Sequence, residues 1–212
     1  MPVEHPAYPV NLLVAGKRCL VVGGGIVAAQ KARGLVEAEA VVHVVAPRIS
    51  DELRDVPGVT WDERGYVVDD LTGCALVITA TDDPAVNHQV YLDADARGIW
   101  VNAADDPVNC TFTLPARVRR GDLLVTVSTG GHSPAVASWL RRRLENDIGP
   151  EFETLLELIA GERERLQREG TSTEGVDWQN AIDSGKLLEL IREGRLAEAK
   201  ERLQACLSSS SG

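Results

Sequence analysis

The chain has 212 residues, 44% of them hydrophobic, and 32 acidic against 22 basic side chains give it a formal net charge of −10. This apolar content excludes a disordered chain, and the length fits one domain with an appendage. The acidic balance excludes a nucleic-acid-binding protein, because binding phosphate requires a basic footprint. The charge is uneven, however: residues 1–115 carry −8, residues 116–150 carry +3 and residues 151–212 carry −5.

The cysteines and the apolar runs indicate the compartment. The four cysteines are scattered and form no C-x-x-C pair, which argues against a zinc site and a disulfide framework and favours a reducing environment. Residues 1–10 contain no apolar signal core, and the longest apolar run, 19–29, is too short to span a bilayer. We therefore expect a soluble cytoplasmic protein with no membrane partner and no resident metal.

The first half of the chain alternates short Val- and Ile-rich runs with helix-like stretches. Strands are expected at 19–22, 41–46, around Thr60, at 75–79 and at 99–102, with helices at 27–37, 51–54 and 85–97. The runs lack a clean polar alternation, as is typical of strands buried on both faces. This order predicts an α/β fold with a parallel, doubly wound sheet of the Rossmann type.

The pattern changes near residue 110. A hairpin is expected from 111–117 and 123–128 around the turn 120–122, followed by a Gly-rich loop and a helix that begins at Ser133-Pro134 and ends near 147. Further helices are expected at 151–167, 187–191 and 196–207, with a polar break at 170–175. The predicted divisions are a Rossmann domain at 1–113, a small segment at 114–148 and a helical C-terminal region at 149–212.

The sharpest motif follows the first expected strand. The run Gly23-Gly24-Gly25-Ile26-Val27-Ala28 fits G-x-G-x-x-A at the start of a helix. Glycines at this turn allow close approach of a pyrophosphate, which then lies on the positive helix N-terminus. The pattern predicts dinucleotide binding, and the alternative is a Gly-rich turn that binds nothing.

The second strand ends without the acidic residue that usually binds the adenosine ribose. Pro47 and Arg48 stand there instead. An arginine at this place suits a 2′-phosphate, so NADP stays open beside NAD, and a solvated surface arginine is the other interpretation.

Polar residues also follow the fourth and fifth strands, where ligands bind in open α/β sheets. The candidates for cofactor contact are Thr79, Ala80, Thr81, Asp82 and Asn102. Asp105 and Asp106 come next, and an aspartate on this edge is suitably placed to act as a general base. Two turn-forming aspartates before Pro107 are the alternative interpretation.

The loop before the helix expected from Ser133-Pro134 offers hydroxyls, backbone N–H groups and a helix N-terminus. It consists of Ser128, Thr129, Gly130, Gly131, His132 and Ser133. Such a loop predicts an anion site for carboxylates or phosphates, and an ordinary capped loop is the alternative.

Several collinear motifs together resemble one family. They are Gly23-Gly24-Gly25-x-Val27-Ala28-x-x-Lys31-Ala32, Ala80-Thr81-Asp82-Asp83-x-x-Val86-Asn87, Asn102-x-x-Asp105-x-Pro107-x-x-Cys110-x-Phe112, Pro115-Ala116, Arg120-Gly121-Asp122-Leu123 and Val127-Ser128-Thr129-Gly130-Gly131-x-Ser133-Pro134. The set, over residues 10–148, resembles the precorrin-2 dehydrogenase / sirohydrochlorin ferrochelatase family, which also forms the N-terminal module of siroheme synthases.

This resemblance implies NAD-dependent oxidation of precorrin-2 to sirohydrochlorin, in siroheme or cobalamin biosynthesis, by a homodimer joined through residues 114–148. It places NAD on the turn 23–27 and on Pro47 and Arg48, and it places the functional aspartate on Asp105. It also allows insertion of Fe²⁺ or Co²⁺ as a substrate metal, for which an aspartate would accept the pyrrole protons.

Two rival hypotheses come from other classes. One is a metal-inserting chelatase with weak dehydrogenase activity, and the other is a non-catalytic dinucleotide sensor. The implied tetrapyrrole is rich in carboxylates, so we expect the basic segment to capture it through Arg117, Arg119 or Arg120. Arg141, Arg142 and Arg143 are expected only to decorate a helix of the dimer.

Overall fold

The computed structural model describes residues 6–170, 176–184 and 186–209, which form two compact units. The first unit contains the chain up to Leu114 together with Gly130–His132, and the second contains Pro115–Thr129 and the chain from Ser133 onward. The predicted boundary between residues 148 and 149 falls inside the second unit.

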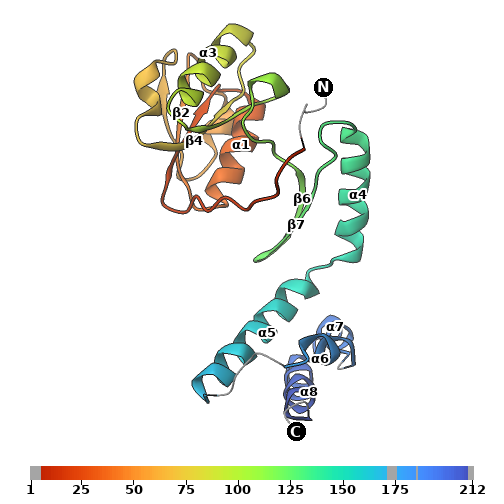
Figure 1. Cartoon of the computed structure of the whole chain (residues 1–212). Coiled ribbons are helices and arrows are strands. Elements are labelled where there is room, and N and C mark those ends of the chain that lie inside the picture. Colours follow the sequence, from red (N-terminus) through yellow and green to blue (C-terminus); the bar gives the residue numbers. More distant parts are fainter. Residues whose placement is uncertain (1–5, 171–175, 185, 210–212) are drawn as a thin grey trace. The chain divides into compact units, whose positions relative to one another are not determined.

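The first unit is built on a five-stranded parallel sheet with the order β3-β2-β1-β4-β5 (Figure 1). The strands are β1 (Arg18–Val22), β2 (Val41–Ala46), β3 (Thr60–Glu63), β4 (Cys74–Thr79) and β5 (Trp100–Ala103). The helices are α1 (Ile26–Val36), α2 (Asp51–Arg54) and α3 (Pro84–Asp95), with 3₁₀ turns η1 (Val68–Leu71) and η2 (Pro107–Asn109). The strand order reverses between β1 and β4, which is where doubly wound sheets bind their ligands.

Apolar clusters cover both faces of this sheet. On one face, Ala28, Ala29 and Ala32 of α1 are fully buried against residues such as Val21 and Val44. On the other face, α3 packs against the same sheet with its own buried residues, among them Val90 and Ala94. Small alanines let α1 approach the strands closely, and burial on both faces explains the near-continuous apolar runs. The predicted Rossmann-type fold is confirmed.

The second unit begins with an antiparallel hairpin and continues as helices. The hairpin is β6 (Ala116–Arg120) paired with β7 (Leu123–Val127), and the helices are α4 (Pro134–Asp147), α5 (Glu151–Arg168), α6 (Trp178–Ser184), α7 (Leu187–Arg192) and α8 (Leu196–Ser209). A cluster that includes Leu155, Leu187 and Leu203 forms the core of the last four helices. None of the helices in the described ranges is long and apolar enough to cross a membrane.

Three details of the second half differ from expectation or confirm it. The first hairpin strand begins at Ala116, whereas position 111 was expected, because the Thr111 N–H donates to the Val101 carbonyl at 2.8 Å and holds that residue beside β5. Helix α6 was not predicted, and residues 171–175 of the expected polar break lie outside the described residues. Helix α4 begins as predicted, with the Ser133 hydroxyl accepting from the Val136 N–H at 3.2 Å.

Candidate functional site

The candidate site lies at the carboxyl edge of the parallel sheet, where three loops meet at two glycines. Gly23 has φ +127, and a Cβ on it would lie 2.3 Å from the Ala80 carbonyl oxygen after β4. A Cβ on Gly24 would lie 1.9 Å from the Arg48 carbonyl oxygen after β2. The loops after β1, β2 and β4 are therefore packed together so closely that only glycine fits at these two positions.

The next glycine, by contrast, faces open space. Gly25 is the N-cap of α1, it has φ −91, and a Cβ built on it would meet nothing within 4 Å. No side chain caps the helix there, and no acidic residue lies in its first turn. The neighbouring Ile26 and Val27 are 58% and 43% exposed, which is unusual for apolar side chains at the start of a packed helix. An uncapped positive helix end with an open approach fits the pyrophosphate of a dinucleotide.

The ends of β2 and β4 complete this side of the site. Pro47 and Arg48 are exposed beyond β2, and Asp82 is exposed beyond β4. The Thr79 hydroxyl is fully buried and has no hydrogen-bond partner among the described residues. The Thr81 hydroxyl lies 2.8 Å from Asn87 Oδ1, to which it donates, so it holds the loop after β4 in place.

The turn after β5 carries the two candidate aspartates, and their surroundings differ. Asp105 is exposed and has φ +60, the left-handed region that few residues other than glycine adopt. Asp106 is half-buried, and its Oδ2 accepts a 2.6 Å hydrogen bond from the Asn109 amide. Asn102, another predicted cofactor contact, is buried, and its amide donates to the Phe112 carbonyl at 2.9 Å.

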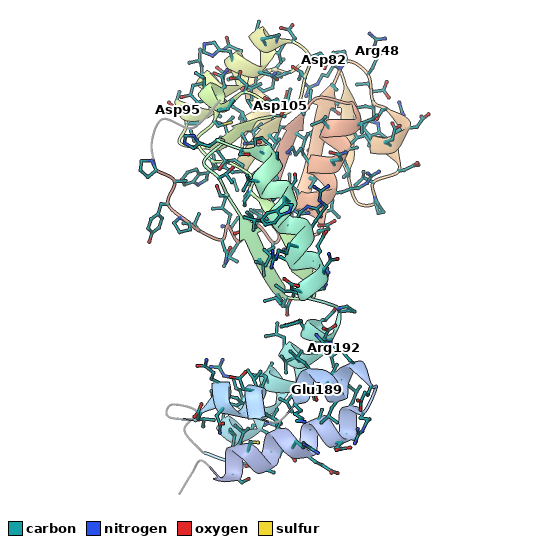
Figure 2. All side chains as sticks on the ribbon, turned by 90° about the vertical axis from the view of Figure 1, so that its right-hand side faces the viewer. Arg48, Asp82, Asp95, Asp105, Glu189 and Arg192 are labelled. Carbon is teal, nitrogen blue, oxygen red and sulfur yellow. The ribbon has the colours of Figure 1, made fainter. Side chains whose placement is uncertain are left out.

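Figure 2 shows how these loop ends are arranged. Arg48, Asp82 and Asp105, which Figure 2 labels, follow β2, β4 and β5 and so lie beyond the carboxyl ends of these parallel strands. The Ala104 N–H donates to the Thr79 carbonyl at 2.8 Å, so the turn of Asp105 directly adjoins the end of β4. The structure thus brings the predicted cofactor turn and the predicted base to one edge of one sheet.

The remaining predicted residues belong to the basic segment and its loop. Arg117 and Arg119 are both exposed and stand on one face of β6, opposite buried Val118. Arg120 is engaged differently: its guanidinium donates to the carbonyls of Ile148 at 2.9 Å and Glu145 at 3.1 Å, at the end of α4. Such bonds satisfy helix C-terminal carbonyls, so Arg120 holds the hairpin to the helix.

The loop at 128–133 is ordered by its own hydroxyls. The Thr129 hydroxyl donates to the Ser133 carbonyl at 3.1 Å and accepts from the Ser133 N–H at 3.3 Å. Gly130 and Gly131 have φ +57 and +75, and His132 is exposed. Two of the hydroxyls predicted to bind an anion therefore already serve the turn and the cap of α4.

Sequence reasoning gave no role to two residues that organise the turn of Asp105. Asn109 is buried and bonded to Asp106, and the Cys110 thiol contacts the backbone of the same turn. Both follow the aspartates within five residues. The family motif already contains Cys110, whereas Asn109 carries no signal beyond its place after an Asp-Pro pair. In the described part of the chain, no three His, Cys, Asp or Glu side chains gather as a metal-binding group.

The sequence of the first unit matches an established family. The family model described as NAD(P)-binding covers residues 10–116, which include the glycine turn and the turn of Asp105. The chain belongs to this NAD(P)-binding family. A second model, described as the central region of a sirohaem biosynthesis protein, matches residues 120–147, which contain β7 and α4 and begin at the last residue of β6.

Curated relatives extend this similarity to nearly the whole chain. A siroheme synthase of Nitrosococcus oceani is 38% identical over 204 residues, or 94% of this chain and 43% of that protein. A siroheme synthase of Pseudomonas aeruginosa is 41% identical over 205 residues, or 94% of this chain and 44% of that protein. The chain spans less than half of the length of these relatives.

A solved structure gives the same result at the level of the fold. The chain is similar to SirC, a precorrin-2 dehydrogenase, with a TM-score of 0.69 and 25% identity over 94% of this chain and 98% of that one. The resemblance that the sequence motifs indicated is therefore confirmed.

Proposed function

We propose that this chain oxidises precorrin-2 to sirohydrochlorin with NAD⁺ as the hydride acceptor, as a step of siroheme biosynthesis. The observation that carries the proposal is the similarity to the precorrin-2 dehydrogenase SirC, which includes 94% of this chain. The carboxyl edge of the sheet supports it, because an open helix N-terminus and an exposed aspartate lie there together.

The glycine turn and the loops beside it would hold the dinucleotide. The N–H groups of the first turn of α1 would bind the pyrophosphate, and Ile26 and Val27 would cover its apolar parts. Pro47 and Arg48 would border the adenosine, while Ala80 and Asp82 would border the nicotinamide side. The bound nicotinamide would accept a hydride from the substrate. The donors of Asn102 and Thr81 are used inside the protein, so they would act on the cofactor only through the loops that they shape.

Asp105 is the residue we propose as the general base. Oxidation of precorrin-2 removes a hydride and a proton, and the proton needs an acceptor within hydrogen-bonding distance of the carbon that loses it. The Asp105 carboxylate is exposed, whereas the Asp106 carboxylate already accepts from Asn109. This difference favours Asp105 over its neighbour.

Capture of the carboxylate-rich substrate would fall to the basic face of β6. Arg117 and Arg119 are exposed on this face, in the one segment of the chain with a positive net charge. We assign Arg120 a structural part, because its guanidinium binds the carbonyls at the end of α4.

We also propose that the second unit pairs with a second copy of the chain. None of the 14 residues of α4 is buried, and Val136 and Trp139 are 47% and 53% exposed. A helix of this length normally buries an apolar stripe, and a two-stranded sheet is not stable by itself. A homodimer joined through β6, β7 and α4 would cover these side chains.

The deciding experiment is a coupled assay of the purified chain. Precorrin-2 is supplied with NAD⁺ or NADP⁺, and absorbance follows both the reduced nicotinamide and the tetrapyrrole. We expect NADH to form in proportion to sirohydrochlorin. Absence of any reduced nicotinamide would refute the proposal. In that case, a metal-dependent spectral change of sirohydrochlorin with Fe²⁺ or Co²⁺ would identify a chelatase, and binding of NAD⁺ without turnover would identify a sensor.

A further inference from the structure

The turn that carries Asp105 has an uncommon backbone conformation that its surroundings must maintain. A non-glycine residue at φ +60 costs about 1–2 kcal/mol relative to an ordinary backbone conformation. Such residues persist only where neighbouring contacts determine the conformation. Backbone hydrogen bonds fix the two sides of the turn, from the Ala104 N–H to the Thr79 carbonyl at 2.8 Å and from the Asp106 N–H to the Ala103 carbonyl at 3.3 Å.

The Cys110 thiol bridges the turn from inside. Its Sγ accepts from the Ala103 N–H at 3.2 Å, and it lies 3.4 Å from the Ala103 carbonyl and 3.3 Å from the Asp106 carbonyl. Burial raises the pKa of the Cys110 thiol, so the S–H group stays protonated and donates to one of these two carbonyls. One sulfur atom thereby holds the residues on either side of Ala104 and Asp105.

Asn109 holds the same turn through side chains. Its Nδ2 donates to Asp106 Oδ2 at 2.6 Å, and its Oδ1 lies 2.8 Å from His88 Nδ1 on α3. The carboxylate of Asp106 only accepts, so it fixes the orientation of the amide and leaves the Asn109 oxygen toward His88. His88 must then carry its proton on Nδ1. The resulting chain of bonds runs from α3 through buried Asn109 to the residue that follows Asp105.

We propose that Asn109 and Cys110 are positioning residues for Asp105, which hold its carboxylate at the place where it accepts the substrate proton. This inference rests on the proposed function, because it assigns the residues a part in that proton transfer. Both side chains act on the residues beside Asp105, and neither contacts the Asp105 carboxylate in the structure.

The matched variants come from the pair Asp106 and Asn109. Asn109→Asp keeps the shape of the side chain but places a second carboxylate against Asp106, which replaces a hydrogen bond with a repulsion. We expect kcat to fall about 100-fold, as for a misplaced catalytic group, with little change in the Kd of NAD⁺. Asp106→Asn keeps an acceptor for the Asn109 amide, and we expect it to lower kcat less than about threefold.

The double variant Asp106→Asn with Asn109→Asp exchanges the two groups. The new carboxylate at 109 accepts from the new amide at 106 and from His88 Nδ1, so the chain of bonds is restored. We expect the double variant to recover kcat to within about tenfold of the wild type. Thermal unfolding of all three variants reports whether each is folded, and the rescue keeps the proposal testable even where Asn109→Asp alone is unstable. A double variant no more active than Asn109→Asp overturns the proposal.

The thiol is tested in the same way with Cys110→Ala and Cys110→Ser. Alanine removes every contact of Sγ with the turn, whereas serine keeps a donor and an acceptor on a shorter side chain. We expect kcat to fall most for alanine and less for serine, again with NAD⁺ affinity unchanged. Equal activity of the alanine variant and the wild type would remove Cys110 from the proposal.

A last comparison separates positioning from general damage. In the background of Asp105→Asn, the change Asn109→Asp should lower the residual kcat less than about threefold, because the group that it positions is already absent. A further 100-fold loss in that background would show that Asn109 acts elsewhere. If Asp105→Asn is itself fully active, the proposed role of Asp105 fails. If only the Asn109 and Cys110 variants are fully active, that role stands and the positioning inference alone fails.

Discussion

The two parts of the molecule that carry the site residues differ in how completely they bury themselves. The Rossmann-type sheet is covered on both faces, and residues such as Val21, Val44 and Val77 are fully buried. In the hairpin only Val118 is buried, and α4 buries nothing. The first region contains a complete apolar core, and its carboxyl edge carries the candidate binding site. The second region leaves apolar side chains exposed, and the proposed homodimer would cover them.

The largest expected effect tests whether the Rossmann-type unit supplies the general base of the reaction. Asp105→Asn removes the charge and keeps the shape, so kcat should fall about 100- to 10,000-fold, the usual contribution of a general base. The Kd of NAD⁺ should stay close to that of the wild type, because the glycine turn is untouched. Steady-state kinetics with precorrin-2 and a separate binding titration measure the two effects. Full turnover in this variant would remove Asp105 from the mechanism.

Neighbouring glycines distinguish packing from ligand binding within the same region. Gly24→Ala places a methyl group 1.9 Å from the Arg48 carbonyl oxygen, so we expect a loss of about 1–3 kcal/mol in the free energy of unfolding. Gly25→Ala meets no protein atom, so it should change that free energy by less than about 1 kcal/mol. It should nonetheless raise the Kd of NAD⁺ at least about tenfold, which corresponds to 1.4 kcal/mol, because the methyl group enters the space of the pyrophosphate. Equal NAD⁺ affinity in Gly25→Ala and the wild type would place the dinucleotide elsewhere.

Two exposed tryptophans test whether α4 lies in the proposed dimer interface. Trp139 on α4 and Trp100 at the start of β5 are 53% and 48% exposed. Trp139→Glu should weaken the dimer at least about 30-fold, as expected for a buried aromatic contact of an interface. Trp100→Glu makes the same change in the Rossmann-type unit and should leave the dimer intact. Light scattering across a concentration series measures both, and a wild-type chain that is monomeric throughout would rule the dimer out.

A smaller effect is expected from the basic face of β6. Arg119→Glu should raise the KM for precorrin-2 about tenfold and steepen its dependence on salt, because the substrate is anionic and such attraction is screened. Arg163→Glu on α5 makes the same change of charge at an exposed position away from the hairpin. Steady-state kinetics at several salt concentrations compare the two variants. Identical KM values would show that β6 takes no part in substrate capture.

The smallest expected effect is on the free energy of unfolding and concerns Asp70, a buried carboxylate of the Rossmann-type unit. Burial alone raises the pKa of Asp70, but hydrogen bonds from the Arg64 guanidinium at 2.6 and 2.9 Å and from the Val67 N–H outweigh it and leave the pKa below its ordinary value. A carboxyl with a lowered pKa stabilises the fold above about pH 4, and this contribution disappears as the pH falls through the folded-state pKa.

Asp70→Asn should therefore cost about 1 kcal/mol at pH 7, because the Arg64 partner is partly exposed, and progressively less as the pH falls below about 4. Glu162→Gln is the counterpart in the second unit, because Glu162 is also buried, and its pKa is lowered by Arg165 and Gln204 against the effect of burial. Denaturant unfolding at several pH values measures both variants. A cost for Asp70→Asn that stays constant down to pH 2 would show that the lowered pKa does not contribute to stability.

The sequence predicted most of the first region because its signals are local. Most of the parallel strands contain a short apolar run, although β3 (Thr60–Glu63) does not, and the glycine motif already indicates the tight turn after β1. The predicted start of the hairpin was less accurate. Thr111 has a strand-like sequence pattern, but its hydrogen bonds to Val101 hold it beside β5. Helix α6 is only seven residues long, and its apolar residues Trp178, Ala181 and Ile182 form a helical pattern too short to stand out in the sequence.

The candidate site was predictable by position but not by geometry. The sequence placed two adjacent aspartates after β5, at the carboxyl edge of the sheet, yet the difference between them depends on φ at Asp105 and on the amide of Asn109. The same holds for Arg120, whose charge indicated substrate while its guanidinium binds helix carbonyls 25 and 28 residues away in the chain. Contacts between residues far apart in sequence decide the role of Arg120, whereas a turn conformation and a local hydrogen bond distinguish the two aspartates.

The left-handed backbone conformation of Asp105 favours different residues for stability and for activity. Glycine adopts φ +60 without steric cost, so Asp105→Gly should fold at least as readily as the natural chain. Selection for a sturdier protein alone would therefore replace this aspartate, and selection for turnover would restore it. If the proposed function holds, the strained backbone of this turn lowers the stability of the chain but places a carboxylate beside the substrate.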